Sequence, residues 1–295
     1  MLFSIVIPTY NNAKLLQRAL NSISLQSFSN YEVIVVDNFS TDNTESVIQR
    51  SNIKNLIYKK IKNEGVISKS RNLGIEISKG DWIHFLDSDD TLHKEKIKFL
   101  TENISSKYDI TCNSQKIIDE DSNSTKIWNY GPYEQDFYRK LLINGNRFST
   151  TASVIKKEFL DRTKIRFNER KDFVTAEDYD FFLNLVDAGA KVKFFNEVLG
   201  THYKYEGSQS SNYEVHKNSI KNVVKHHVYN IQKFSHNKDK LWAGLQWRFE
   251  LLDFLNNLKK KKYVLSSFTL LKIILKSPLK LTDFFLFKLK KKLKY

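Results

Sequence analysis

The sequence has very little cysteine, proline or glycine. Its 295 residues include one cysteine, three prolines and nine glycines. The single cysteine, Cys112, excludes an internal disulfide and is typical of a reducing compartment. So few prolines and glycines argue against a linker-rich or disordered chain. With 41% hydrophobic residues, the chain can form one large domain, alone or with an appended segment.

Three kinds of sequence signal are also missing. No uninterrupted run approaches the ~20 apolar residues that a membrane-spanning helix needs. The N-terminus begins directly with a strand pattern and has neither a basic region nor a small-residue cleavage site, so we do not expect secretion. No Gly-x-Gly-x-x-Gly follows the first predicted strand and no Gly-Lys-Ser/Thr occurs, which excludes the common dinucleotide and phosphate-loop fingerprints.

Acidic residues are scarce at the C-terminal end. Residues 259–295 contain twelve lysines and one acid, Asp283, and carry +11 of the formal net charge of +15. The preceding 258 residues therefore carry only +4. This distribution predicts a nearly neutral globule followed by a strongly basic tail.

The N-terminal third alternates short apolar runs with helical patterns. We predict an α/β fold with helices on both faces of a mostly parallel sheet, whose first strands lie at 2–7, 31–36, 56–60 and 82–86. Ligands bind such sheets beyond the carboxyl ends of the strands. Polar residues follow three of these strands, at 9–11, 37–38 and 87–90. The sequence therefore predicts one site built from three strand ends.

Residues 82–92, Trp-Ile-His-Phe-Leu-Asp-Ser-Asp-Asp-Thr-Leu, are the centre of this prediction. The apolar half is typical of a buried strand, and the polar half places Asp87, Asp89 and Asp90 within four residues. Clustered carboxylates raise one another's pKa unless a cation offsets their charge. Oxygen ligands at a strand tip suit Mg²⁺ or Mn²⁺ shared with a substrate phosphate. The alternative is a solvated Asp/Ser turn that closes the strand.

Five motifs, in their order and spacing, resemble those of the family 2 nucleotide-sugar glycosyltransferases. They are Ser4-Ile-Val-Ile-Pro-Thr-Tyr-Asn11, Val35-Val-Asp-Asn-Phe-Ser-Thr-Asp42, Ser70-Arg-Asn-Leu-Gly74, Gly80-Asp-Trp-Ile-His-Phe-Leu-Asp-Ser-Asp-Asp90 and Ala176-Glu-Asp-Tyr-Asp180. The resemblance covers about residues 2–210. It implies a Rossmann-like, nucleotide-sugar-binding fold of the glycosyltransferase A type, an inverting sugar transfer and a divalent metal on the Asp-x-Asp motif.

The resemblance also implies a donor-binding set of residues. Its members are Pro8, Thr9, Tyr10, Asp37, Asn38, Arg71, Asp87 and Ser88. The Tyr10 ring would pack on the nucleotide base. Asp37 and Asn38 would face the base or the ribose, and Arg71 the nucleotide or its diphosphate.

The metal and the identity of the nucleotide follow from the same resemblance. Asp89 would be the firmest ligand of Mn²⁺ or Mg²⁺, while Asp87 and Ser88 would contact the ribose or the metal. Asn38 stands where many relatives have a second Asp. Its amide can pair with a uracil edge, so UDP is the expected nucleotide.

Asp178 has two interpretations. The resemblance implies that it is the general base that removes the proton of the acceptor hydroxyl. Alternatively, it is a helix-start residue, with Thr175 as the N-cap of the helix. A carboxylate in the first helical turn stays ionised, so we expect a weak base, which an oxocarbenium-like transition state tolerates. Glu177 points about 100° away around the helix and is less suited to this role.

Residues 200–210 match the family poorly. Relatives often have Tyr-Arg-x-His before Ser-x-Ser, whereas Tyr203 and Tyr205 stand at these places here, with His202 and Lys204 beside them. A metal or pyrophosphate contact from His202 or Lys204 is a secondary prediction.

We divide the chain into a catalytic domain, 1–225, and a helical basic extension, 226–295. The catalytic domain comprises a donor half of about 1–107 and an acceptor half of about 108–225. The extension mixes lysine with Phe and Leu in segments 263–275 and 279–295, a composition typical of chains that lie on an anionic membrane surface. A dimerisation or partner helix is the alternative. Nucleic acid is not expected, because the aromatics are not interleaved as stacking platforms.

Together with the basic tail, the resemblance implies a bacterial glycosyltransferase that is cytoplasmic and peripheral on the inner face of the cell membrane. It would move a sugar from a UDP donor to a lipid-linked or cell-surface glycan of lipopolysaccharide, O-antigen or capsule type. One alternative is a sugar-nucleotidyltransferase, which usually needs a glycine-rich basic loop where this chain has Pro8-Thr-Tyr-Asn11. The other is a non-catalytic membrane scaffold that binds nucleotide sugars.

Overall fold

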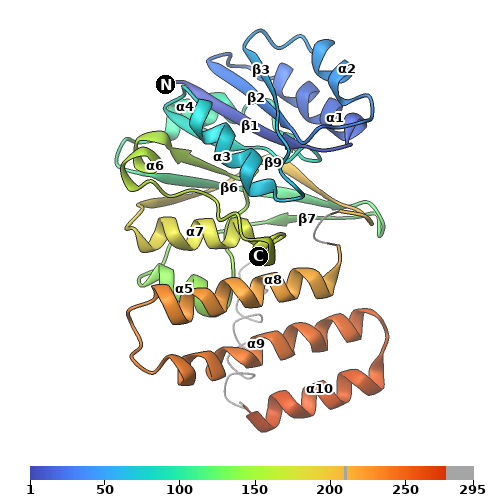
Figure 1. The fold of residues 1–295 in the computed structure, drawn as a ribbon, viewed down its shortest axis with the longest axis vertical. Coiled ribbons are helices and arrows are strands. Elements are labelled where there is room, and N and C mark those ends of the chain that lie inside the picture. The colour runs from blue at the N-terminus through green and yellow to red at the C-terminus, as the bar shows by residue number, and fades with distance from the viewer. Residues whose placement is uncertain (209–210, 277–295) are drawn as a thin grey trace. The chain divides into compact units, whose positions relative to one another are not determined.

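The computed structural model describes residues 1–208 and 211–276, and the chain divides into two compact units, 1–223 and 224–295 (Figure 1). The elements of the first unit are β1 (Phe3–Thr9), α1 (Ala13–Ser24), β2 (Tyr31–Asp37), α2 (Thr44–Gln49), β3 (Leu56–Lys60), α3 (Ile67–Ile77), β4 (Trp82–Phe85), β5 (Thr91–Leu92), α4 (Lys96–Asn103), β6 (Ile110–Asp119), β7 (Ser124–Trp128), α5 (Phe137–Asn144), β8 (Ser153–Lys156), α6 (Lys157–Thr163), the 3-10 helix η1 (Lys171–Phe173), α7 (Glu177–Asp187) and β9 (Val192–Lys204). The helix α8 (Tyr213–His226) crosses the boundary between the units.

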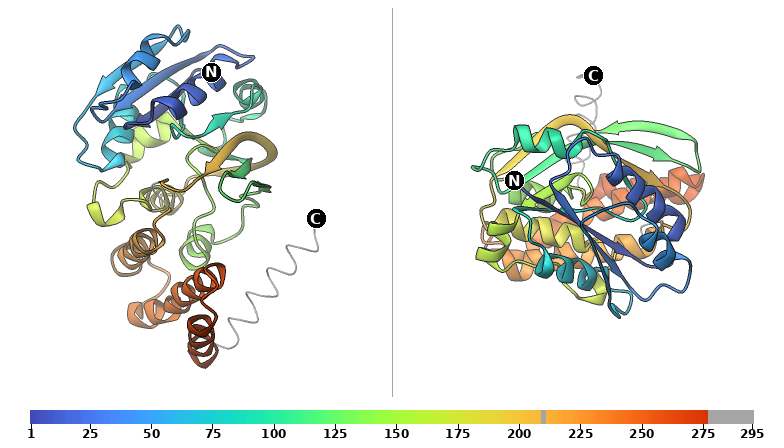
Figure 2. Two further views of the ribbon diagram at one scale, coloured as in Figure 1. Left: turned by 90° about the vertical axis from the view of Figure 1, so that its right-hand side faces the viewer. Right: turned by 90° about the horizontal axis from the view of Figure 1, so that it is seen from above.

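The described strands form one sheet in the order β3-β2-β1-β4-β8-β6-β9-β5, with β7 paired to β6. As predicted, β1 is parallel to β2 and β4, and β2 is parallel to β3. Beyond β4 the sheet is mixed, because β8 is antiparallel to β4 and β6 while β9 is parallel to β6. The strand β9 is strongly curved and also pairs with β5, which directly follows the acidic stretch (Figure 2). The predicted α/β fold class is confirmed, as is the presence of helices at the C-terminal end.

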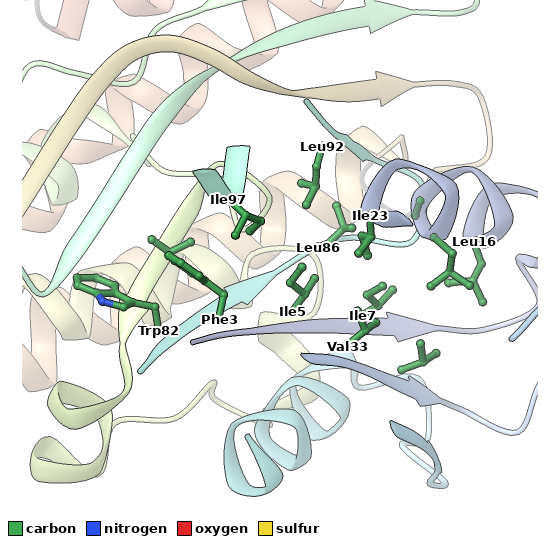
Figure 3. Packing of buried hydrophobic residues seen from close by; sticks show 14 of the residues in the cluster. Phe3, Ile5, Ile7, Leu16, Ile23, Val33, Trp82, Leu86, Leu92 and Ile97 are labelled. Atoms are coloured by element: carbon green, nitrogen blue, oxygen red, sulfur yellow. The ribbon is translucent and has the colours of Figure 1, made fainter. Parts of the chain in front are cut away.

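The two faces of the parallel strands are covered by different helices. Phe3, Ile5 and Ile7 alternate along β1 and pack with apolar residues of α1 and α4 on one face (Figure 3). Val6 points to the opposite face, where α3 lies. A Cβ atom on Gly74 would stand 2.2 Å from the Val6 Cγ1 atom, so only a glycine lets α3 approach β1 this closely.

Phenylalanine side chains pack α7 against β4 and two neighbouring loops. The Phe181 ring stacks on Phe167 with centroids 3.9 Å apart and meets Phe85 of β4 edge-on at 6.1 Å. On the neighbouring position, Phe182 stacks on Phe148 at 4.4 Å. These contacts are of the geometry that aromatic pairs prefer. They place the first turn of α7 close to the end of β4.

The second unit is helical. It continues from α8 into a π-helical turn, η2 (His227–Ile231), and the paired helices α9 (Lys238–Lys259) and α10 (Tyr263–Lys276). The predicted helix at 263–275 is confirmed, whereas the predicted segment 279–295 lies outside the described residues. Among the helices that the structure describes, none is both long and apolar enough to cross a membrane.

Candidate active site

The carboxyl ends of three strands meet at one edge of the sheet. Thr9 is paired with Asp37, and the Asn38 amide donates a hydrogen bond to the Thr9 carbonyl at 3.0 Å. On the other side of β1, the Leu86 amide donates to the Val6 carbonyl at 2.9 Å. The polar segments that follow β1, β2 and β4 therefore adjoin one another, as the sequence predicts.

The side chains of Asp37 and Asn38 accept hydrogen bonds from other residues of the protein. Asp37 is fully buried; its Oδ1 accepts from the Ser40 amide at 3.0 Å, and its Oδ2 from the Tyr58 hydroxyl at 2.8 Å. Burial, together with Asp37, raises the pKa of Tyr58 to about 12. The Asn38 Oδ1 accepts from the Asn63 amide at 2.8 Å. Both residues thus shape the loops after β2 and β3, and their contact with a nucleotide stays a prediction.

The end of β1 offers one exposed ring and one buried hydroxyl. Pro8 and Thr9 are buried, and the Thr9 hydroxyl has no hydrogen-bond partner within the described part of the chain. Tyr10 is 57% exposed, so its ring is available for stacking. The expected roles of these three residues are therefore compatible with their positions.

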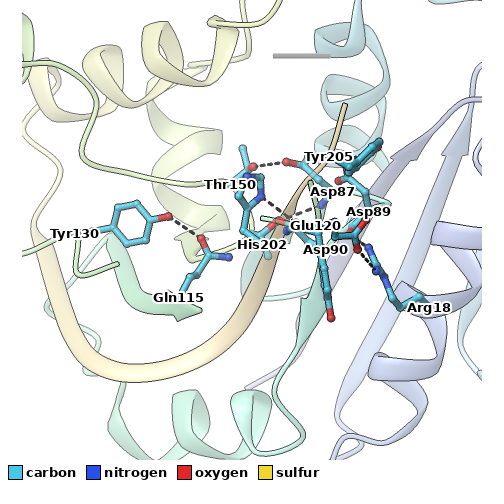
Figure 4. A network of polar contacts seen from close by, with 12 residues as sticks. Arg18, Asp87, Asp89, Asp90, Gln115, Glu120, Tyr130, Thr150, His202 and Tyr205 are labelled. Carbon is cyan, nitrogen blue, oxygen red and sulfur yellow. Dashed lines mark hydrogen bonds and ion pairs between the residues drawn. The ribbon is translucent and has the colours of Figure 1, made fainter. Parts of the chain in front are cut away.

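Asp87 is held from two sides. Its Oδ1 accepts from the Arg71 guanidinium at 2.8 Å, and its Oδ2 accepts from the Thr150 hydroxyl at 3.0 Å (Figure 4). The Asp87 amide in turn donates to the Thr151 hydroxyl oxygen at 3.3 Å. Ser88 lies beside it and accepts from the Asn12 side chain at 3.4 Å.

Asp89 and Asp90 contact the curved strand β9 and the residue that follows it. The Tyr205 hydroxyl donates to the Asp89 Oδ2 at 3.0 Å, and the His202 Nδ1 lies 3.0 Å from the Asp90 Oδ1 (Figure 4). Asp90 is fully buried, and its Oδ2 has no hydrogen-bond partner among the residues that the structure describes. His202 is thus brought to the acidic cluster, whereas Lys204 lies exposed at the end of β9.

The electrostatics of this cluster favour a cation. Burial raises the pKa of Asp89 to about 6, and the charges of Asp90 and Asp87 add to this effect. Burial alone would lower the pKa of His202, but the hydrogen bond and charge of Asp90 outweigh it, so this pKa is raised. A positive ion at the cluster would offset the mutual repulsion of the carboxylates.

Arg71 connects the two halves of the first unit. It is buried, and its two terminal nitrogens bind Asp87 at 2.8 Å and Glu177 of α7 at 2.7 Å. Each carboxylate raises the pKa of Arg71, against the opposing effect of burial. In this structure, both arms of the guanidinium are occupied by protein carboxylates. The nucleotide contact implied for Arg71 stays a prediction. Its ion pairs with Asp87 and Glu177 were not predicted from the sequence.

Asp178 directly follows Glu177 in the sequence, and two expectations about it need correction. The N-cap of α7 is Ala176, and Thr175 has a positive φ of 79° and makes no cap, so the prediction of Thr175 as N-cap is wrong, although Asp178 does lie in the first turn of the helix. Asp178 is half-buried, and its Oδ2 accepts from the Asn146 side chain at 3.0 Å. Burial and the charge of Glu177 raise its pKa to about 7, with Arg71 opposing them. Burial and Glu177 outweigh the groups that favour the ionised carboxylate, so Asp178 is a stronger base than expected.

Several residues of the site were not predicted from the sequence. Asn146 and Thr150 come from a loop whose sequence has no recognisable pattern, so no signal marked them. Tyr205 was noticed only as a departure from the family pattern. Arg18 of α1 donates to the Asp89 carbonyl at 2.7 Å, and its guanidinium lies 3.5 Å from the centre of the Tyr203 ring. Its spacing on α1 fits a surface residue as well, and no motif includes it.

The side chains of residues 1–208 and 211–276 do not by themselves complete a metal site. Within the described residues, no group of three or more His, Cys, Asp or Glu side chains is arranged to hold a metal ion. Mg²⁺ typically uses one or two carboxylates, with waters and substrate phosphates as the other ligands. Asp89 and the unpartnered Asp90 oxygen fit that kind of donor set.

The fold places the protein in a structural class. The crystal structure of residues 1–349 of Staphylococcus aureus TarS with UDP-GlcNAc has a TM-score of 0.63 at 23% identity, over 94% of this chain and 81% of that one. A mannosyltransferase, PcManGT, from Pyrobaculum calidifontis in complex with GDP-Man and Mn²⁺ has a TM-score of 0.57 at 16% identity, over 96% and 79%. The chain spans 43% of a longer TarS structure. The fold is therefore that of the glycosyltransferase A-type enzymes.

Sequence comparison narrows the class to a family. The model of glycosyl transferase family 2 matches residues 4–163. The amylovoran biosynthesis glycosyltransferase AmsB of Erwinia amylovora is 30% identical, over 68% of this chain and 69% of that protein. The poly(ribitol-phosphate) beta-N-acetylglucosaminyltransferase TarP of Staphylococcus aureus is 28% identical, over 87% of each. The beta-1,3-glucosyltransferase WfaP of Escherichia coli, which is named for UDP-Glc and GlcNAc-diphosphoundecaprenol, is 30% identical, over 72% and 80%. The chain belongs to glycosyl transferase family 2, and it is a glycosyltransferase.

Proposed function

We propose that the protein is a metal-dependent, inverting glycosyltransferase that moves a sugar from a UDP donor to a lipid-linked or cell-surface glycan. The observation that carries the proposal is the Arg71 bridge. It joins Asp87, in the acidic stretch, to Glu177, the neighbour of Asp178. A donor bound at Asp89 and an acceptor bound at Asp178 would therefore meet at one edge of the sheet.

The donor would be held by the strand ends. The exposed Tyr10 ring can stack on a uracil base, and Asp37 and Asn38 lie at the neighbouring strand end. Asp89, with Asp87 and the unpartnered Asp90 oxygen, would hold Mn²⁺ or Mg²⁺, which supplies positive charge to the leaving diphosphate when bound. His202, 3.0 Å from Asp90, would add a cationic group beside the same diphosphate.

Asp178 would act as the general base. With a pKa of about 7, its carboxyl group is partly ionised at neutral pH and can accept the proton of an acceptor hydroxyl. The acceptor oxygen then forms a bond to the anomeric carbon as the bond between that carbon and the diphosphate oxygen breaks. A single displacement of this kind inverts the configuration. The Asn146 amide, 3.0 Å from the Asp178 Oδ2, orients the base.

The relatives support a cell-envelope glycan as acceptor. AmsB is named for amylovoran, TarP for poly(ribitol-phosphate) and WfaP for a diphosphoundecaprenol-linked sugar. We infer the same class for this chain, of lipopolysaccharide, O-antigen or capsule type. The sugar itself is not specified by these names, because they differ from one relative to the next.

We further propose that the second unit binds an anionic membrane surface, which places the enzyme peripherally on the inner face of the cell membrane. On α10, six large apolar residues are exposed: Tyr263, Val264, Leu265, Phe268, Leu271 and Ile274. Four lysines, at 259–262, precede this helix, and the basic residues of 277–295 follow it in the sequence. Exposed apolar side chains flanked by lysines are typical of helices that lie in a lipid interface.

Turnover with a panel of nucleotide sugars tests the proposed function. The protein is incubated with Mn²⁺, each nucleotide sugar and a cell-envelope glycan fraction, and the products are separated. Free UDP, released together with a glycosylated acceptor, is the expected result. Pyrophosphate release would instead indicate a nucleotidyltransferase, and binding without turnover a scaffold; either result would contradict the proposal.

A further inference from the structure

Two fully buried basic side chains flank the acidic residues 87–90 in the sequence, and the proposed reaction uses neither. They are Lys96, in the first turn of α4, and His84 of β4, both 0% exposed. The Lys96 ammonium donates to the Thr151 carbonyl at 2.7 Å and lies 3.1 Å from the His84 Nε2. The same His84 nitrogen is 2.8 Å from the Thr151 carbonyl.

A buried lysine in this place is costly. Removing an ammonium group from water is unfavourable unless strong partners replace its hydration. Here burial lowers the pKa of Lys96 to about 7, although Cys112 and Asp90 act in the opposite direction. A methionine of similar length would fill the same space without this penalty. The packing of α4 alone therefore does not account for a lysine.

The carbonyl that Lys96 binds belongs to the turn that holds Asp87. This turn, residues 150–152, is closed by a hydrogen bond from the Ser153 amide to the Thr150 carbonyl at 3.2 Å. On its front side, the Thr150 hydroxyl donates to the Asp87 Oδ2 at 3.0 Å, and the Thr151 hydroxyl accepts from the Asp87 amide at 3.3 Å. Lys96 and His84 contact the same turn through the Thr151 carbonyl.

We propose that Lys96 is a positioning residue for the nucleotide and metal site, acting on Asp87 through the Thr150–Thr151 turn. The inference rests on the proposed function, since it assumes that Asp87 faces a metal-bound nucleotide. Lys96 itself touches neither ligand. Its contact with the Thr151 carbonyl sets the position of the two hydroxyl groups that orient the Asp87 carboxylate and amide.

The first test compares Lys96→Met with Lys98→Met. Lys98 is on the same helix but exposed, so it is a matched control. The affinity for UDP in the presence of Mn²⁺ is measured by calorimetry on full-length protein, and folding is checked by circular dichroism. Substituting a residue that orients a metal ligand typically weakens metal affinity about 10- to 100-fold. We expect a loss of this size in Lys96→Met and none in Lys98→Met.

A double-mutant cycle with Thr150→Val tests whether Lys96 acts on Asp87 through the Thr150–Thr151 turn. If Lys96 acts through the turn, Lys96→Met and Thr150→Val each weaken UDP–Mn²⁺ binding, and the double variant is within about twofold of the weaker single variant. Independent effects that multiply in the double variant would overturn the proposal. So would wild-type affinity in a folded Lys96→Met protein.

A second Lys96 variant and the wild-type binding measurement cover the remaining outcomes. If Lys96→Met does not fold, Lys96→Gln replaces it; its amide nitrogen is one atom closer to the backbone than the Lys96 ammonium, so we expect it to lose the hydrogen bond to the Thr151 carbonyl. Weaker UDP–Mn²⁺ binding is expected there too, and unchanged binding would count against the inference. If the wild-type protein binds no nucleoside diphosphate with Mn²⁺, the proposed function fails and takes the inference with it. If the wild type binds and the Lys96 variants match it, only the inference fails.

Discussion

The Asp178 carboxyl group titrates near neutral pH because burial and the charge of Glu177 both disfavour its ionised form. Arg71 opposes this effect, but its guanidinium is shared between Glu177 and Asp87. A base with a pKa of about 7 is well matched to catalysis at neutral pH, since it combines sufficient ionisation with sufficient basicity.

The rate of transfer should therefore depend on pH through Asp178. The ionised carboxylate is the active form, so kcat should rise with pH and level off above about 7, and it should fall about tenfold per unit below that value. Asp178→Asn should lower kcat by about 10²- to 10⁴-fold and abolish this dependence. A pH–rate profile of both proteins checks the prediction. Full activity in Asp178→Asn would end the assignment of the base.

Arg71 should matter for stability as well as for binding. Removing one partner of a buried ion pair leaves an uncompensated charge and typically costs about 3–5 kcal/mol. Arg71→Met leaves both Asp87 and Glu177 without their partner, so we expect a loss of this size in the free energy of unfolding measured in urea. Adding Glu177→Gln to this variant should recover part of the loss. A stability equal to that of the wild type would show that the bridge contributes nothing.

At the scale of elements, α10 presents an apolar face that is unusual for a surface helix. Val264 and Phe268, one turn apart, are 74% and 63% exposed. Contiguous exposed apolar residues usually mark an interaction site. Because twelve lysines lie between 259 and 295, an anionic lipid surface is the partner that matches both properties.

Vesicle binding tests this assignment. Replacing Val264, Phe268 and Leu271 by serine should weaken binding to anionic vesicles, and deleting residues 259–295 should abolish it. Binding should also weaken with salt and be poor on zwitterionic vesicles. Ile127→Ser, at an exposed residue of β7, is the matched control and should leave binding unchanged. If neither the serine variant nor the deletion reduces vesicle binding, the membrane proposal is wrong.

At the scale of the whole molecule, the structure of residues 1–107 could be predicted from sequence because its signals are local. Apolar runs such as Tyr31–Asp37 end in polar residues at a parallel sheet edge, and pattern alone places them. The site residues between 108 and 225 could not be predicted in the same way, because their positions depend on tertiary contacts. Thr175, for example, adopts a positive φ and contacts His216 instead of capping α7, which no local pattern indicates.

The pKa of Asp178 illustrates the same limit. Its place in the first turn of α7 predicts an ionised side chain. The burial of the carboxyl group and the charge of Glu177 instead raise its pKa. Likewise, the motif containing Arg71 was recognised from the sequence, but its pairing with Glu177 spans 106 residues of chain. Such long-range pairs follow from the fold and not from the motif.

The central claim is that carboxylates at the strand ends bind a nucleoside diphosphate through a divalent ion, next to a separate base. Calorimetric titration of UDP into wild-type, Asp89→Asn and Asp178→Asn protein, with Mn²⁺ and with EDTA, tests it without any need for the acceptor. We predict Mn²⁺-dependent binding to the wild type and to Asp178→Asn, and the loss of that dependence in Asp89→Asn. Equal Mn²⁺-dependent affinity in Asp89→Asn and the wild type, or no effect of Mn²⁺ on the wild type, would contradict the account.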